Sequence, residues 1–186
     1  MQDFVHLHVH TQYSILDGQS SIQRLVDKAL KNGMRGMAVT DHGNMMGIKE
    51  LYNYVKKKKG VAKDNLKIWT ERLGQIEAGT YAPDATKKDK DEKDDAGKTK
   101  DELKEKYNKK IAEAKFIVAF KPILGCEMYV AHHHLSDKNG KEDHSGWHLI
   151  VLAKNEVGYH HLIKLVSKAW TDGFYMRPRT DHGVSF

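Results

Sequence analysis

Residues 4–18 read FVHLHVHTQYSILDG, and the first seven of them alternate between two kinds of position. The odd-numbered positions carry Val, Leu and Val, whereas the even-numbered ones carry Phe followed by three His. Because successive side chains of a strand point to opposite faces, this alternation predicts a strand with an unusually polar second face. The pair Asp17-Gly18 predicts a turn that closes the loop after it.

A helix is predicted directly after this loop. Ser20 or Ser21 can cap its N-terminus. The apolar residues that follow have the spacing of a helix with one buried face, and they are Ile22, Leu25, Val26, Ala29 and Leu30. Gly33 stands where a helix commonly ends on a left-handed glycine.

Strands and helices alternate along most of the remaining chain. Apolar runs predict strands at 36–40, 122–130 and 147–153, and helical spacing predicts helices at 46–59 and about 156–170. Such alternation is typical of βα units around a parallel sheet or barrel. The predicted fold class is therefore α/β.

Residues 61–120 interrupt this alternation. Between residues 87 and 110, 18 of 24 residues are charged, which predicts an insertion that is largely helical or disordered. One amphipathic helix can still form there, with Leu103, Tyr107, Ile111 and Ala114 on its apolar face. The predicted organisation is one domain in two parts, 1–60 and 121–186, separated by this lysine-rich insertion. A surface hairpin of helices with no function beyond packing is the alternative.

The composition excludes several classes of protein. A single cysteine, Cys126, rules out a disulfide framework and a cysteine-clustered zinc site. No apolar run approaches the ~20 residues that span a bilayer, and no signal peptide precedes the first predicted strand. We therefore expect a cytoplasmic protein with no membrane partner. The net charge of +6 comes from local lysine runs, so it is weak evidence for nucleic acid.

Residues able to bind metal gather around the predicted strands. His8 and His10 are two apart, so both imidazoles point to one side and could hold a metal ion or form a buried, hydrogen-bonded pair. Further candidates stand in the loop after that strand and in three later strands or strand ends, namely Asp17, Asp41, His42, Glu127 and His148. Mixed imidazole and carboxylate ligands suit zinc, manganese or iron(II). Their convergence from separate strands predicts a metal site.

Five segments, in order, resemble the PHP (polymerase and histidinol phosphatase) domain, in the form found at the N-terminus of bacterial DNA polymerase III alpha subunits. They are HVHT at 8–11, YSILDG at 13–18, TDHGN at 40–44, GCEMYV at 125–130 and HLIVLAKN at 148–155. Residues 173–179 are also similar to that family. The resemblance covers residues 3–59 and 121–182, which is nearly everything outside the predicted insertion.

The resemblance implies a TIM-barrel-like fold, here part of a distorted (β/α)7 barrel, with up to three divalent metal ions at its mouth. By resemblance, His8 and His10 would bind one metal together with Glu127. Glu127 would bridge to a second metal, which His148 also holds. Asp17 and His42 would belong to a third, with Asp41 beside it as a ligand or as a support. Glu127 and Asp41 are the residues to which the resemblance assigns catalysis.

The resemblance also implies a function. The parent protein would be a DNA-directed DNA polymerase acting in DNA replication, and the barrel a metal-dependent phosphodiesterase that proofreads as a 3′–5′ exonuclease. DNA, the sliding clamp and the proofreading subunit would be partners of the longer protein. The family has further ligands late in the domain, among them an Asp-x-His pair, and nothing matching them follows residue 148, so we expect a truncated piece.

Two alternatives remain open from the sequence. One is a stand-alone PHP phosphatase that acts on a small phosphate monoester such as histidinol phosphate. The other is a non-catalytic scaffold that binds the separate proofreading subunit. Among the remaining residues, Cys126 is interpreted as a small buried side chain rather than a nucleophile. Arg177 and Arg179 could either meet phosphate or be surface arginines of a rigid loop around Pro178.

Overall fold

The computed structural model describes residues 4–83 and 90–181, which belong to two compact units. The first unit comprises Met1–Val55 and Phe120–Phe186, and the second comprises Lys56–Ala119. In the part of the chain that is described, no helix combines the length and the apolar character that crossing a membrane requires.

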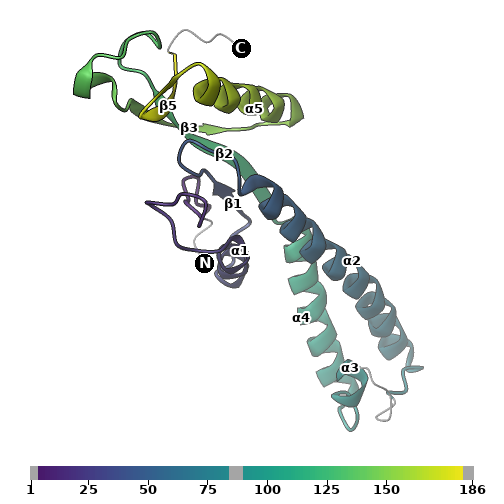
Figure 1. The fold of residues 1–186 in the computed structure, drawn as a ribbon. Coiled ribbons are helices and arrows are strands. Elements are labelled where there is room, and N and C mark those ends of the chain that lie inside the picture. Colours follow the sequence, from purple (N-terminus) through teal and green to yellow (C-terminus); the bar gives the residue numbers. More distant parts are fainter. Residues whose placement is uncertain (1–3, 84–89, 182–186) are drawn as a thin grey trace. The chain divides into compact units, whose positions relative to one another are not determined.

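The sheet of the first unit is built around β2 (Lys121–Val130), which is shown in Figure 1. The first half of β2 pairs in parallel with β1 (Gly36–Val39), and its second half pairs with β3 (Trp147–Leu152). The end of β2 also pairs in parallel with β5 (Arg177–Thr180), which in turn pairs antiparallel with β4 (Phe174–Tyr175). The result is a mixed α/β fold whose sheet is open over the described residues.

β3 departs from the parallel sheet that βα units predict. β3 runs antiparallel to β2, with Tyr129 opposite His148, whereas βα units would have made it parallel. A parallel return needs a long crossover, usually a helix. The connection over residues 131–146 contains only a short 3-10 turn at Gly140–Asp143. The chain therefore comes back alongside β2 as a hairpin.

The predicted first strand does not form over residues 4–10. The segment lies along β1, where the Ala38 N–H donates to the His6 carbonyl and the Thr40 N–H donates to the Val9 carbonyl. Two steps along β1 thus match three steps along the N-terminal segment. This extra residue breaks the ladder in the manner of a bulge. The alternation in the sequence cannot reveal such a slip in pairing.

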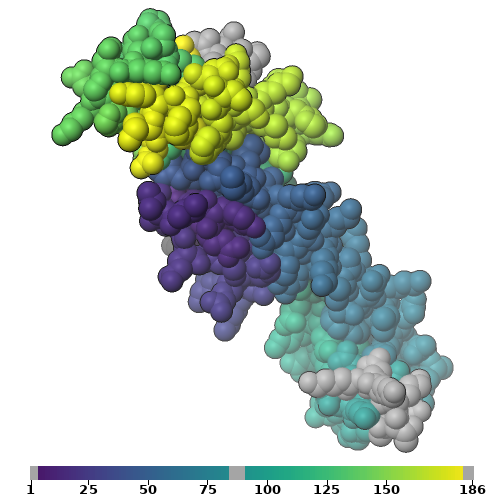
Figure 2. All heavy atoms as spheres, in the orientation of Figure 1, coloured from purple at the N-terminus to yellow at the C-terminus, as the bar shows by residue number. Residues whose placement is uncertain are grey.

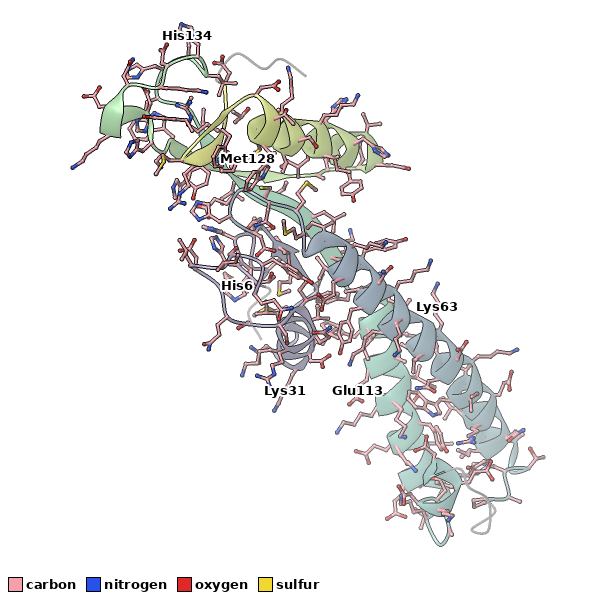
Figure 3. The ribbon with its side chains drawn as sticks, in the orientation of Figure 1. His6, Lys31, Lys63, Glu113, Met128 and His134 are labelled. Atoms are coloured by element: carbon pink, nitrogen blue, oxygen red, sulfur yellow. The ribbon has the colours of Figure 1, made fainter. Side chains whose placement is uncertain are left out.

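Two helices, together with residues 48–55 at the start of a third, pack against the sheet of the first unit. α1 (Ile22–Lys31) buries its apolar stripe in one core with β1. Ser21 occupies its N-cap position, but its side chain makes no capping hydrogen bond. Gly33, two residues after the end of the helix, has the expected left-handed φ of +74°. α5 (Glu156–Thr171) packs Leu162 and Leu165 against Cys126 and Met128 of β2. Met128 is labelled in Figure 3. The predicted positions of both helices are confirmed.

The second unit is helical. α2 (Ile48–Ala78) continues through the lysine run far beyond its predicted end at residue 59, and α4 (Lys100–Ala119) lies beside its later part (Figure 1). A short α3 (Lys90–Lys93) precedes α4. The residues that α4 buries are those predicted, Leu103, Tyr107, Ile111 and Ala114. Lys63 on α2 and Glu113 on α4, both labelled in Figure 3, are exposed. That residues 61–120 are an insertion into one domain stays a prediction.

Candidate metal centre

Backbone pairing places the end of β1 beside the middle of β2. The Glu127 N–H donates to the Asp41 carbonyl over 3.1 Å, and the Gly43 N–H donates to the Glu127 carbonyl over 2.8 Å. His42 and Glu127 therefore form a parallel bridge beyond the end of β1. Main-chain hydrogen bonds alone therefore make neighbours of His42 and Glu127, which are 85 positions apart in the chain.

The register of β3 brings in His148. His148 lies opposite Tyr129, so it is diagonal to Glu127, which shares a face of β2 with Tyr129. Long side chains can reach each other across such a diagonal. The Nδ1 atom of His148 lies 2.9 Å from Oε1 of Glu127. The alternate residues of β2, Cys126 and Met128, point to the other face and into the core against α5.

The N-terminal segment supplies two more imidazoles. The Nε2 atoms of His8 and His10 lie 3.3 Å and 2.7 Å from Oε2 of Glu127, and 2.8 Å from each other. The broken pairing with β1 thus does not prevent both side chains from reaching the same carboxylate. These three residues form one group in which three possible metal ligands face one another.

Asp17 joins the cluster from the other side. Its Oδ2 atom lies 2.6 Å from Nδ1 of His42 and 3.9 Å from Nδ1 of His10. His42 is also 4.0 Å from Oε2 of Glu127. Two further groups result, one of His10, Asp17 and His42 and one of His42, Glu127 and His148, and within each group the ligand atoms lie within 4.8 Å of one another. Six of the seven predicted metal ligands are therefore together, and we call them the histidine–carboxylate cluster.

The cluster fits a divalent metal ion. Among the described residues, the buried atoms Nδ1 of His10 and Nε2 of His42 have no hydrogen-bond partner. Leaving a buried polar atom unpaired costs about 1–3 kcal/mol, and the lone pair of a neutral imidazole nitrogen is a common metal ligand. Carboxylate oxygens beside imidazole nitrogens are the donors that zinc, manganese and iron(II) accept.

The surroundings lower the pKa of both carboxylates of the cluster. Burial raises the pKa of Glu127, but the charge of His42 and the hydrogen bonds with His8 and His148 outweigh it and leave that pKa below its ordinary value. The hydrogen bond with His42 lowers the pKa of Asp17. A metal ion binds the deprotonated carboxylate, which is the form that a lowered pKa favours.

Asp41, the seventh predicted ligand, lies outside the three groups. Its buried carboxylate accepts hydrogen bonds from the Thr11 N–H (2.7 Å), the Thr11 hydroxyl and the Ser14 hydroxyl (2.8 Å). Ser14 in turn accepts the backbone N–H of His42 over 3.0 Å. Asp41 thus anchors the loop that carries Asp17 and the peptide that carries His42. Its predicted roles as ligand and catalytic residue stay predictions.

Sequence reasoning missed three supporting residues. Thr11 and Ser14 hold Asp41, and the ring of Tyr129 stacks on His42 with centroids 4.4 Å apart and an interplanar angle of 16°. Tyr129 could have been found, because it is two positions from Glu127 on a predicted strand and so shares its face. The contacts of Thr11 and Ser14 depend on the path of the loop, which the sequence pattern does not give.

Two further residues considered in the sequence analysis, Arg179 and Cys126, are buried in the structure. Arg179 is fully buried and donates hydrogen bonds to the carbonyls of Leu135, Asp137 and Gly173, so its interpretation as a surface arginine is wrong. Figure 2 shows the green segment that contains Leu135 and Asp137 against the yellow C-terminal part of the chain. Cys126 is buried, and burial raises its pKa to about 12, which agrees with a structural side chain.

A sequence model of the PHP domain matches residues 6–80 and 95–185, which include every residue of the histidine–carboxylate cluster. The chain is 35% identical over 181 residues to the DNA polymerase III subunit alpha of Treponema pallidum (strain Nichols). It is 32% identical over 181 residues to that of Borreliella burgdorferi and 31% identical over 182 residues to that of Chlamydia trachomatis serovar D.

These alignments cover 96–97% of the chain but only 10% of each relative, so the chain spans about a tenth of the length of the curated relatives it matches. The family model, by contrast, matches most of the chain, including both segments that build the candidate metal centre and all of α2 and α4. The chain belongs to the PHP domain family.

Proposed function

We propose that this chain is the PHP domain of a bacterial DNA polymerase III alpha subunit, and that its histidine–carboxylate cluster hydrolyses phosphodiester bonds as a 3′–5′ exonuclease. The observation that carries the proposal is the convergence of six His, Asp and Glu side chains on one place, with two buried imidazole nitrogens unpaired among the described residues. The likeness to alpha subunits of DNA polymerase III supports DNA as the substrate.

Each of the three groups of the cluster would hold one metal ion. His8, His10 and Glu127 would hold one ion, and Glu127 would share a second with His42 and His148. Asp17 with His10 and His42 would hold a third. When bound, such ions lower the pKa of water and neutralise charge on a phosphate.

The chain's own residues orient and expose this centre. Ser14 and the stacked ring of Tyr129 fix His42, while burial and the histidines around it hold Glu127 in one place. The side chains of His8 and His148 are about half exposed, 51% and 48%, so the cluster is open to a substrate on that side.

In the proposed hydrolysis, water is the nucleophile and the 3′ oxygen of the preceding nucleotide is the leaving group. The oxygen of water forms a bond to phosphorus, the bond from phosphorus to the 3′ oxygen of the preceding nucleotide breaks, and one proton of water ends on that 3′ oxygen. The products are a nucleoside 5′-monophosphate and a DNA strand one nucleotide shorter.

The proposal also covers the longer protein. We expect the open sheet to be part of a distorted (β/α)7 barrel, and the whole protein to be a DNA-directed DNA polymerase, a nucleotidyltransferase of the cytoplasm. Its partners would be DNA, the sliding clamp and the proofreading subunit. The relatives, of which this chain spans a tenth, support this assignment.

The direct test is digestion of single-stranded DNA labelled at its 5′ end by the full chain loaded with zinc or manganese. We expect stepwise shortening from the 3′ end, abolished by Glu127→Gln and unchanged by Glu113→Gln on the exposed face of α4. Intact DNA with a protein that retains its metal would contradict the exonuclease. Release of phosphate from a small monoester would then favour the phosphatase, and neither activity would favour the scaffold.

A further inference from the structure

A groove of about 430 Å³ opens beside the histidine–carboxylate cluster. Asp17 and His42 belong both to the groove and to the cluster, and Tyr129, which stacks on His42, lines the groove as well. The volume lies within the range of ~300–1,000 Å³ that is usual for small-molecule sites. A ligand in this groove would therefore lie against the metal centre.

Two aromatic rings form one wall of the groove. Trp170 and Phe174 stack with centroids 5.6 Å apart and an interplanar angle of 18°. The indole N–H of Trp170 donates to the Gly43 carbonyl over 2.8 Å, which fixes this ring next to the peptide that follows His42. Both rings remain about half exposed, at 48% and 47%. A rigid aromatic surface is thus open to solvent beside the centre.

The lining of the groove also includes exposed apolar side chains. Ile15 and Leu16 are 89% and 80% exposed, although their loop is closed by hydrogen bonds from the Asp17 and Gly18 N–H groups to the Ser14 carbonyl. Met176, 60% exposed, has a left-handed φ of +61°, which a residue other than glycine adopts only where its surroundings impose it. The backbone therefore holds these side chains at the groove.

Arg177 adds a cationic, exposed side chain to the same lining. The combination of a flat aromatic wall, apolar flanks, a guanidinium group and an adjoining metal centre matches a flat heteroaromatic base that is joined to phosphates. An apolar segment of a partner protein would use the flanks, but it would have no use for the guanidinium group or for the metal centre.

We propose that this groove binds the base of the nucleotide at the 3′ end of single-stranded DNA, with Arg177 near the adjacent phosphate and the bond to be broken at the cluster. The inference rests on the proposed function, because it supplies the substrate subsite of that reaction. Stacking on aromatic side chains accepts every base, so the groove recognises an unpaired end rather than a sequence.

The test uses the full chain and an oligonucleotide with 2-aminopurine at its 3′ end, whose fluorescence falls when the base stacks. A matched oligonucleotide with an abasic 3′ end serves as competitor. We expect the base-bearing end to bind at least about fivefold more tightly, the lower limit that stacking supplies. Phe174→Leu, which keeps an apolar side chain but removes the ring, should reduce this preference, whereas Phe4→Leu, equally exposed outside the groove, should not.

The result that would overturn the inference is equal binding of base-bearing and abasic ends, or a preference that Phe174→Leu leaves unchanged. Leu16→Ser changes an exposed side chain of the same groove and gives a second reading should Phe174→Leu fail to fold. We expect it to weaken binding of the base-bearing end about threefold. Measuring binding without metal and cleavage with metal separates the two proposals. A base preference without cleavage refutes the exonuclease alone, and cleavage without a base preference refutes the groove alone.

Discussion

Each of the two units contains a buried carboxylate at the centre of a polar network. Glu127 in the first unit is 5% exposed and Asp95 in the second is fully buried. Around Asp95 stand donors that carry their own protons: the hydroxyl of Tyr107 at 2.6 Å, the hydroxyl of Tyr81 at 2.8 Å and the ammonium group of Lys106. Around Glu127 stand imidazoles, which can accept as well as donate.

This difference separates a network that stabilises the fold from a candidate ligand site. Burial raises the pKa of Asp95, but Lys106 and the two tyrosine hydroxyls outweigh it, so the network is complete without any added ion. The cluster around Glu127 brings His8 and His10 nitrogens within 2.8 Å of each other and leaves other imidazole nitrogens unpaired among the described residues. A buried network that lacks partners indicates a ligand.

The largest effect should come from Glu127→Ala, because Glu127 belongs to two of the three ligand groups. We expect loss of bound zinc or manganese by elemental analysis, a larger effect than the ~10–100-fold typical of losing a residue that only supports a ligand. Glu113→Ala, an exposed glutamate of α4, is the matched control. Retention of metal by Glu127→Ala would contradict the distinction between the networks around Glu127 and Asp95.

The next largest effect should follow Asp95→Ala, which leaves the Lys106 ammonium group without its buried carboxylate. Breaking a buried pair in this way costs about 3–5 kcal/mol of unfolding free energy, which urea titration measures. The exposed neighbour Asp94 provides the control, since Asp94→Ala should change stability by less than about 0.5 kcal/mol. The metal content should stay the same in both variants, and a loss of metal would show that the two networks are not separate in function.

Ser14→Ala tests the support of the cluster. The variant removes the hydroxyl that donates to Asp41 and accepts the N–H of His42, so a buried N–H loses its partner at a cost of about 1–2 kcal/mol. We also expect metal affinity to fall about tenfold. Ser20→Ala, whose side chain is exposed, should change neither quantity. Unchanged affinity in Ser14→Ala would show that His42 is held by other contacts.

The smallest expected effect is on how the free energy of unfolding depends on pH in acid. Since the pKa of Asp95 is lowered from its ordinary 3.8, the carboxylate contributes stability that is complete above that value and is lost as the pH falls below it, through the lowered pKa of the folded state. Unfolding free energies measured between about pH 5 and pH 2 should fall less steeply in Asp95→Asn than in the unchanged chain. Equal slopes would contradict the lowered pKa.

Most of the fold could be predicted from local patterns. α1, β1, α5 and the buried face of α4 follow from apolar spacing within each element. The features that the sequence did not predict depend on pairing between distant segments. They are the slip of residues 4–10 along β1 and the antiparallel return of β3. The length of α2 was missed because Gly60, Gly74 and the lysine run resemble an ending. In the structure these glycines are helical, with nothing near their α-carbons that a side chain would meet.

The candidate site could be predicted nearly in full. Six of the seven predicted ligands meet, although among them only His42 lies just beyond the end of a strand: Glu127 lies within β2, and His8 and His10 lie in a segment that forms no strand. Asp41 could not be separated from them, because its partners are hydroxyl groups of a loop whose path no periodic pattern describes. Whether the six bind metal stays a prediction.

The alternation of side chains along β2 has a consequence for errors of assembly. Glu127 and Tyr129 face the cluster while Cys126 and Met128 fill the core against α5. A slip of β2 by one residue would exchange the two sets, since each step turns a side chain to the opposite face. It would bury a carboxylate among leucines and place a thiol or a thioether among the histidines. Misregistered chains would thus lose their core and their candidate metal ligands in the same event.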